Sequence, residues 1–144
     1  MNTRPLLVVE DSDEDFEAVS WALRRLGRTL PVERCVDGDA ALARLREPGR
    51  PSPGLILLDL NLPGTDGRDV LAAIKRDPHL NVLPVLIMST SVSDSDVRGC
   101  YDAGANGYLV KPVNFQLFME QIGVMCSFWF DIAQLPVPVM PEQA

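Results

Sequence analysis

Residues 55–64 read LILLDLNLPG, an apolar run that ends on the carboxylate of Asp59. The run lies between Pro53-Gly54 and Pro63-Gly64, so it predicts a short strand bounded by turns. A strand that is apolar on both faces is typical of the centre of a parallel sheet covered by helices. Ligands of such sheets bind beyond the carboxyl ends of the strands, which is where Asp59 is expected. Taken alone, Asp59 fits an Asx turn equally well.

The rest of the chain alternates between apolar strands and amphipathic helices. This order predicts an α/β fold, a doubly wound parallel five-stranded sheet with helices on both faces. Arg34 in the second strand places that strand nearer an edge. We expect the domain to occupy residues 1–135 and a proline-rich tail to occupy residues 136–144. The expected strands are 5–9, 30–36, 55–58, 83–88 and 107–110, and the expected helices are 16–26, 37–45, 66–76, 93–102 and 115–134.

The formal net charge of the chain is −7, and 47% of its residues are hydrophobic. This composition argues against disorder. The acidic balance argues against a nucleic-acid or membrane partner, because both require a basic surface. No apolar run approaches the length of a membrane span, and the N-terminus lacks the pattern of a signal peptide. The three cysteines are far apart and lack metal-binding spacing, which predicts a reduced, cytoplasmic protein.

Polar side chains follow four of the predicted strands: Glu10 and Asp11, Asp59, Ser89, and Lys111. The carboxyl ends of parallel strands share one edge of the sheet, so these side chains are expected to meet. Two carboxylates ~5 Å apart repel by roughly 3 kcal/mol at an effective dielectric of ~20, so a cluster of three implies a divalent cation. Oxygen ligands favour Mg²⁺, with Mn²⁺ or Ca²⁺ as substitutes. A carboxylate nucleophile, a metal, a lysine and a hydroxyl together suit in-line phosphoryl transfer to Asp59.

Each of these residues also has an ordinary explanation when it is taken alone. Glu10 and Asp11 suit the acidic start of a helix, and Ser89 can cap a turn. Lys111 can be a solvated surface lysine, which is the commonest fate of that residue type. The functional interpretation depends on all of these residues following strands whose carboxyl ends lie at the same edge of the sheet.

Four motifs add a family resemblance: VVED at residues 8–11, LDLNLP at 58–63, MST at 88–90 and YLVKP at 108–112. With these motifs, residues 5–126 resemble a response-regulator receiver domain, which has the flavodoxin-like fold with strand order 2-1-3-4-5. The resemblance implies a two-component response regulator in which Asp59 accepts a phosphoryl group from a histidine kinase. It implies a phosphoacceptor with slow self-dephosphorylation rather than an enzyme.

The resemblance also implies roles for the residues around Asp59. Ser89 and Lys111 would contact the phosphoryl group, and Tyr108 would act with Ser89 as the switch. The Lys111–Pro112 peptide bond is expected to be cis. Asn61 and Ser91 flank the site and are candidates for setting the phosphate lifetime. The metal ligands implied are Glu10, Asp11, Asp59 and the backbone carbonyl of Asn61.

Further segments narrow the resemblance to the single-domain regulators that accompany bacterial phytochrome histidine kinases. These segments are residues 59–67, 89–91, 100–106 and 128–130. The expected partner is therefore a sensor histidine kinase, and a bacteriophytochrome in particular. The phosphohistidine must come from that partner, because the one histidine here, His79, is expected in a loop. Without an expected output domain, the signal would pass to a partner protein, through a phosphorelay, or end as phosphate drained from the kinase.

Three other functions compete with this interpretation. A hydrolase with an aspartyl nucleophile, of the haloacid-dehalogenase type, would need a second Asp where this chain has Asn61. A nucleotide or flavin module would need a glycine-rich loop where residues 10–15 are acidic and would repel phosphate. A receiver used only as a scaffold would not need the intact set of acids, serine and lysine.

The last predicted helix is apolar on more than one face. Phe115, Phe118 and Ile122 begin a stripe with helical spacing, yet Val124 and Phe128 lie off it. Such a helix needs more than one burial partner. We expect a homodimer through the fourth helix, the fifth strand and the fifth helix. The alternative is that the helix end and the following prolines fold back on the domain.

Overall fold

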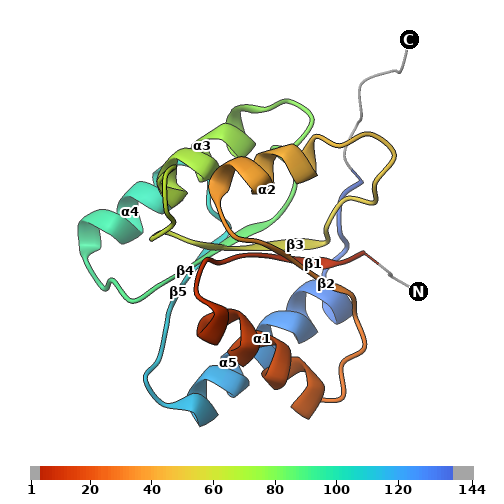
Figure 1. Cartoon of the computed structure of the whole chain (residues 1–144), viewed down its shortest axis with the longest axis vertical. Helices are drawn as coiled ribbons and strands as arrows, with labels where there is room; N and C mark the ends of the chain where they lie inside the picture. The colour runs from red at the N-terminus through yellow and green to blue at the C-terminus, as the bar shows by residue number, and fades with distance from the viewer. Residues whose placement is uncertain (1–3, 138–144) are drawn as a thin grey trace.

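The computed structural model describes residues 4–137. Its strands form one parallel sheet in the order β2-β1-β3-β4-β5 (Figure 1), which confirms the predicted fold class and strand order. The central strands β1, β3 and β4 are buried along their whole length, whereas both edge strands are partly exposed. The strands are β1 (Leu6–Val9), β2 (Val32–Cys35), β3 (Leu55–Asp59), β4 (Val85–Ser89) and β5 (Gly107–Val110).

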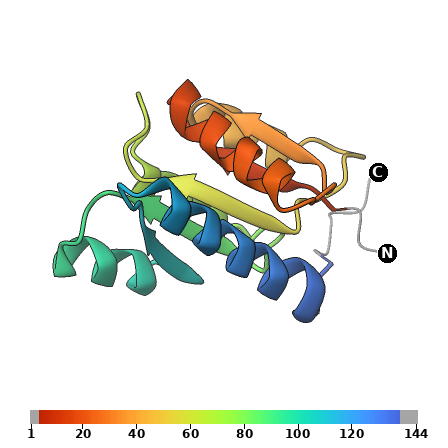
Figure 2. The ribbon, with the colours of Figure 1, turned by 90° about the horizontal axis from the view of Figure 1, so that it is seen from below.

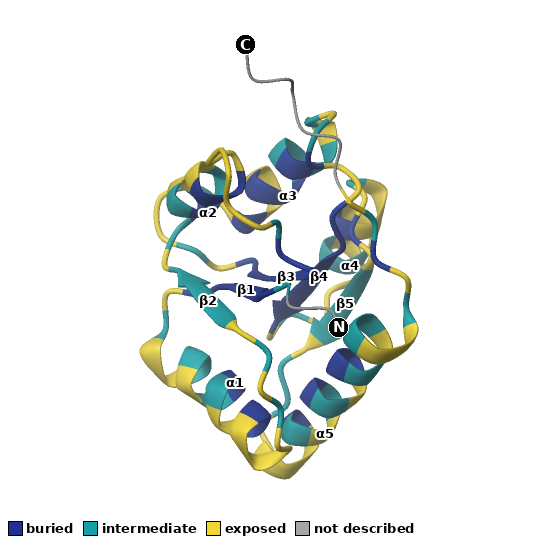
Figure 3. Ribbon diagram, turned by 90° about the vertical axis from the view of Figure 1, so that its right-hand side faces the viewer, coloured by how far each residue is buried: buried dark blue, intermediate teal, exposed yellow. Residues whose placement is uncertain are grey.

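The helices cover both faces of the sheet. Helices α1 and α5 lie side by side on one face (Figure 2), and α2, α3 and α4 lie on the other side (Figure 3). Alternate side chains of the central strands therefore enter two separate apolar cores, one under each helical layer. The helices are α1 (Asp13–Arg25), α2 (Gly38–Leu45), α3 (Gly67–Arg76), α4 (Asp94–Asp102) and α5 (Phe115–Cys126).

Each of these helices begins after a residue whose side chain accepts a hydrogen bond from a backbone N–H of the first turn. This contact satisfies donors that have no partner within the helix. It also fixes where each helix begins relative to the preceding strand end. The capping residues are Ser12, Asp37, Asp66, Ser93 and Asn114.

The chain after α5 continues as a wider π-helical segment, η1 (Ser127–Ile132), and becomes extended at Ala133. The helix predicted to run to residue 134 thus ends slightly earlier and changes its winding. Phe130 and Leu135 lie against Gly54, where an added Cβ would come within 2.8 and 2.9 Å of their side chains. The Arg4 guanidinium donates to the Pro136 carbonyl over 2.6 Å. This end of the chain therefore packs on its own domain, and residues 138–144 of the predicted tail lie outside the described part.

Within residues 4–137 the thiols of all three cysteines are free. None of the helices described is long and apolar enough to cross a bilayer.

Candidate functional site

Lys111 joins three acidic side chains at the carboxyl edge of the sheet. Its Nζ donates to Oδ2 of Asp59 over 3.0 Å, to Oε1 of Glu10 over 2.9 Å and to Oδ2 of Asp15 over 2.7 Å. Asp59 is the last residue of β3, Glu10 follows β1 and Lys111 follows β5. The topology therefore brings these strand ends to one pocket.

Burial makes it costly to keep the carboxylates of this cluster charged. Glu10 is 1% exposed and Asp59 is 5% exposed. Burial, and then a hydrogen bond to Asp59, raise the pKa of the Glu10 carboxyl to about 7, against the opposing effect of Lys111. Burial by itself would lower the pKa of the Lys111 ammonium, but its hydrogen bonds to the three carboxylates prevail and raise it above its usual value. Lys111 therefore stays charged, whereas Glu10 titrates near neutral pH.

The carboxylates of Glu10, Asp15 and Asp59 could hold a metal ion. Each offers an oxygen atom, and these atoms all lie within 4.8 Å of one another. Three carboxylates with a single ammonium leave an excess of negative charge, and an all-oxygen donor set suits a hard divalent cation. The donor chemistry of the pocket thus fits the cation that the sequence implied.

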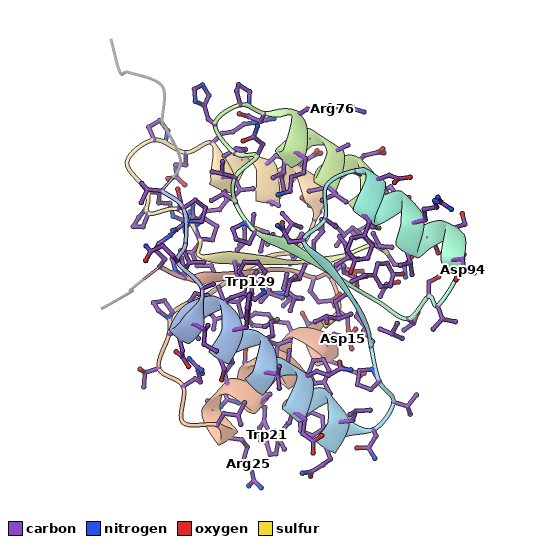
Figure 4. All side chains as sticks on the ribbon, turned by 180° about the vertical axis from the view of Figure 1, so that it is seen from behind. Asp15, Trp21, Arg25, Arg76, Asp94 and Trp129 are labelled. Carbon is purple, nitrogen blue, oxygen red and sulfur yellow. The ribbon has the colours of Figure 1, made fainter. Side chains whose placement is uncertain are left out.

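Asp15 is a member of this cluster that the sequence did not indicate. The sequence pattern explains Asp15 as the third residue after the Ser12 cap, and its N–H does donate to the Ser12 hydroxyl over 3.2 Å. Its carboxylate is then free to turn toward Lys111, and Figure 4 shows Asp15 where α1 begins, next to the sheet. Asp11, by contrast, has an exposed side chain and does not belong to the carboxylate group found among the described residues.

The loop after β3 fixes the Asp59 carboxylate from its other side. The Asn61 backbone N–H donates to Oδ1 of Asp59 over 2.9 Å, so the two carboxylate oxygens have different partners. The loop returns at Gly67, where an added Cβ would lie 2.4 Å from the Asp59 carbonyl oxygen. Only glycine allows α3 to begin this close to the strand. The start of α3 and the Asp59 backbone therefore form one rigid unit.

Ser89 ends β4 beside the cluster and is 1% exposed. Its carbonyl accepts from the Lys111 N–H over 2.8 Å, and its hydroxyl oxygen accepts from the Ser91 N–H over 3.1 Å. The Tyr108 hydroxyl donates to the Ser91 carbonyl over 3.0 Å. The two residues expected to form the switch are thus linked through one residue of the β4–α4 loop.

The expectation of a cis peptide bond between Lys111 and Pro112 is wrong. All peptide bonds of the described residues, including this one, are trans. The trans form is the more stable isomer even before proline, by about 0.5–1 kcal/mol. Lys111 reaches Asp59 with the trans bond in place.

Two regulatory proteins have sequences similar to this one. The response regulator Rcp1 of Synechocystis sp. is 40% identical over 137 residues, which span 91% of this chain and 92% of Rcp1. The probable methanogenesis regulatory protein FilR2 of Methanothrix harundinacea is 38% identical over 136 residues, which span 92% of this chain and 88% of FilR2.

Solved structures show the same likeness. The phosphorylated cyanobacterial phytochrome response regulator RcpA matches with a TM-score of 0.87 at 37% identity, over 94% of this chain and 99% of RcpA. The Mn²⁺-bound form of Rcp1 matches with a TM-score of 0.85 at 38% identity, over 93% of this chain and 99% of Rcp1. Residues 6–123 match the response regulator receiver domain family itself. The chain therefore belongs to that family and is a two-component response regulator.

Proposed function

We propose that Asp59 accepts a phosphoryl group from the phosphohistidine of a sensor histidine kinase. The observation that carries this proposal is the buried Asp59 carboxylate held 3.0 Å from the Lys111 ammonium. An oxygen of Asp59 attacks the phosphorus, the new P–O bond forms as the P–N bond breaks, and the imidazole keeps the electron pair. Lys111 neutralises charge on the transferring oxygens, because an ammonium with three donors can turn from a carboxylate to a phosphoryl oxygen.

A divalent cation completes the proposed site. Mg²⁺ is the expected ion, with Mn²⁺ or Ca²⁺ as substitutes, and the similar Rcp1 structure holds Mn²⁺. When bound, such an ion stabilises the charge that spreads over the phosphoryl oxygens. Asp11 directly follows Glu10 and its exposed side chain can turn toward the pocket, whereas Asp15 makes the shortest of the three Lys111 contacts, at 2.7 Å. The ligands that we propose are Glu10, Asp11, Asp59 and the backbone carbonyl of Asn61.

Ser89 and Tyr108 carry the signal away from the pocket in this proposal. The Ser89 hydroxyl rotates to bind the phosphoryl group, and Tyr108 follows the loop that both residues contact. The phosphoaspartate then hydrolyses slowly without a catalytic base of this chain. The backbone of Asn61 contacts Asp59 and that of Ser91 contacts Ser89, and we propose that the side chains of Asn61 and Ser91 set the lifetime of the phosphate.

We propose a bacteriophytochrome kinase as the partner and the cytoplasm as the location. The phytochrome link is supported by RcpA and by the bacteriophytochrome response regulator RtBRR, which matches with a TM-score of 0.74 at 35% identity. An apolar surface borders the pocket and could receive a kinase helix. On it, Val113 is fully exposed and the rings of Trp21 and Phe115 meet at 4.8 Å.

We also propose a homodimer through α4, β5 and α5. Val124 is 71% exposed and Phe128 is 48% exposed on the outer side of α5 and η1. They border a groove of about 510 Å³ that Leu109 and Trp129 also line. A second copy would cover this apolar face, which the fold-back of Phe130 and Leu135 leaves open.

Treatment with phosphoramidate and Mg²⁺, followed by intact-mass measurement, tests phosphoryl acceptance. The wild-type chain should gain the mass of one phosphoryl group, and the Asp59→Asn variant should gain none. Equal gain by both proteins would contradict the assignment of Asp59.

A further inference from the structure

A chain of hydrogen bonds ties the β4–α4 loop to the start of α3. The Ser91 hydroxyl donates to Oδ2 of Asp96 over 2.6 Å. Oδ1 of the same carboxylate accepts from the Arg68 guanidinium over 2.5 Å, and the other terminal nitrogen of Arg68 contacts the Asp66 carboxylate at 3.1 Å. The two carboxylate oxygens of Asp96 thus accept from different residues, one from Ser91 and one from Arg68. We call this chain of contacts from Ser91 through Asp96 to Arg68 the link.

The Arg68 end of this link is fixed to the phosphoacceptor strand. Arg68 directly follows Gly67, which packs on the Asp59 carbonyl too closely to accept a Cβ. The Gly67 N–H also donates to the Leu60 carbonyl over 3.1 Å. Arg68 therefore extends from a part of the fold that cannot shift independently of Asp59.

The Ser91 end of the link contacts both switch residues. The Ser91 N–H donates to the Ser89 hydroxyl oxygen, and its carbonyl accepts from the Tyr108 hydroxyl. The Ser91 side chain faces Asp96, so the backbone and the side chain of this one residue connect Asp96 to Ser89 and Tyr108. Replacing Asp96 should therefore affect the positions of both Ser89 and Tyr108 through Ser91.

We propose that Asp96, held by Arg68, is a positioning residue that acts through Ser91 to keep Ser89 and Tyr108 in their unphosphorylated arrangement. This inference rests on the proposed phosphorylation of Asp59. A Ser89 hydroxyl that binds a phosphoryl group must release the Ser91 N–H or draw the loop with it. Movement of the loop breaks the contact of Asp96 with Ser91 or with Arg68, so the link opposes the phosphorylated state.

The expected effect of removing the Asp96 charge can be judged from how exposed the Arg68–Asp96 ion pair is. The side chains of Arg68 and Asp96 are 45% and 26% exposed, and ion pairs of that kind shift an equilibrium by a factor of about 1.5 to 5. The 2.6 Å hydrogen bond from the Ser91 hydroxyl to the charged Asp96 carboxylate adds to this factor. Removing the Asp96 charge should therefore favour the phosphorylated arrangement by about three- to tenfold.

Beryllofluoride with Mg²⁺ mimics a phosphoryl group on a carboxylate and gives an equilibrium measurement. Its affinity for the full chain can be followed by tryptophan fluorescence, to which Trp21 contributes with a ring that contacts Phe115, close after Lys111. Asp96→Asn should bind beryllofluoride about three- to tenfold more tightly than wild type. Arg68→Ala should change the affinity in the same direction by a smaller factor, and Arg68→Lys should restore the wild-type value. The double variant Arg68→Ala/Asp96→Asn should match Asp96→Asn.

Two control variants separate this role from general charge effects. Asp94→Asn removes an exposed carboxylate from the same first turn of α4, so it reproduces any effect on the helix dipole. Arg76→Ala removes an exposed charge from the other end of α3, and both residues are labelled in Figure 4. Both controls should bind beryllofluoride as wild type does.

The outcomes distinguish the two proposals. A wild-type chain that binds no beryllofluoride in Mg²⁺ would overturn the role of Asp59 and the link with it. A wild-type chain that binds normally, with Asp96→Asn equal to it, weaker than it, or no different from Asp94→Asn, would overturn the link alone. Arg68 is exposed, so its variants test the link even where Asp96→Asn lowers thermal stability.

Discussion

The Nζ atom of Lys111 lies 3.0 Å from Oδ2 of Asp59, although the two residues are 52 positions apart in the chain. The same ammonium contacts Glu10 and Asp15, and its side chain is only 14% exposed. One cation thus holds together a carboxylate cluster that would otherwise repel itself. This relationship gives the carboxylate proposed to accept a phosphoryl group a cation within hydrogen-bonding distance.

Replacing Lys111 with Met should slow phosphorylation of Asp59 by about 10²–10³-fold, because a positioned charge contributes that much to a transferring group. Time-resolved intact mass after addition of phosphoramidate measures the rate. Lys111→Arg keeps the charge and should retain part of it. A Lys111→Met protein that reacts at the wild-type rate would remove Lys111 from the mechanism.

Mg²⁺ binding should strengthen as the pH rises from 6 to 8. The pKa of Glu10 is about 7, so below that pH a proton competes with the cation for this carboxylate. Without bound metal, the free energy of unfolding should fall as the pH rises from 4.5 to 7. In this range the folded state still holds the Glu10 proton that the unfolded chain has already released.

Calorimetric titration with Mg²⁺ across this pH range tests the dependence on Glu10. Glu10→Gln has no proton to lose and should bind Mg²⁺ weakly, with a much flatter pH profile. An unchanged profile in Glu10→Gln would assign the titration to another group.

Asp11 and Asp15 should differ in their importance for metal binding. Asp15 makes the shortest of the three Lys111 contacts, at 2.7 Å, whereas Asp11 is exposed and directly follows the buried Glu10. Asp11→Asn should therefore weaken Mg²⁺ binding by about tenfold or more, and Asp15→Asn by less. The reverse order would transfer the ligand role from Asp11 to Asp15.

Gly67→Ala should destabilise the fold by roughly 1–3 kcal/mol, because the new methyl group would overlap backbone atoms of Asp59 and Leu60. Gly99→Ala in α4 is the matched control, since its added Cβ would meet nothing within 4 Å. It should stabilise the protein by about 0.5–1 kcal/mol. Urea unfolding measures both values, and equal effects of the two variants would refute the close packing at Gly67.

Light scattering after size exclusion should show the wild-type chain as a dimer. Val124→Glu places a charge in the proposed interface and should yield a monomer. Val82→Glu, at a 47% exposed position between α3 and β4, should remain dimeric. A monomeric wild type at high concentration would remove the dimer from the proposal.

The features that the sequence predicted well depend on local apolar patterns. Buried runs such as residues 55–58 identify central strands, and polar residues that follow such runs fall on one edge by topology alone. Asp59 and Lys111 could therefore be placed together before the structure was known.

The features that it missed depend on how separate elements pack. The direction of the Asp15 carboxylate follows from where α1 begins relative to β5. The contact of Arg68 with Asp96 joins the first turns of two helices, between residues 28 positions apart. The trans bond before Pro112 is the intrinsically more stable isomer, which the family resemblance did not predict. The change of winding at Ser127 was not predicted from the sequence either. No periodicity in the chain encodes them.

Locating the phosphorylated carboxylate tests the central claim most directly. Borohydride reduces an acyl phosphate on aspartate to homoserine, so peptide mass spectrometry after phosphoramidate, Mg²⁺ and borohydride identifies the acceptor. We predict homoserine at position 59 and unmodified side chains at Glu10, Asp11 and Asp15. Reduction at one of those neighbouring acids, with Asp59 intact, would contradict the proposed mechanism.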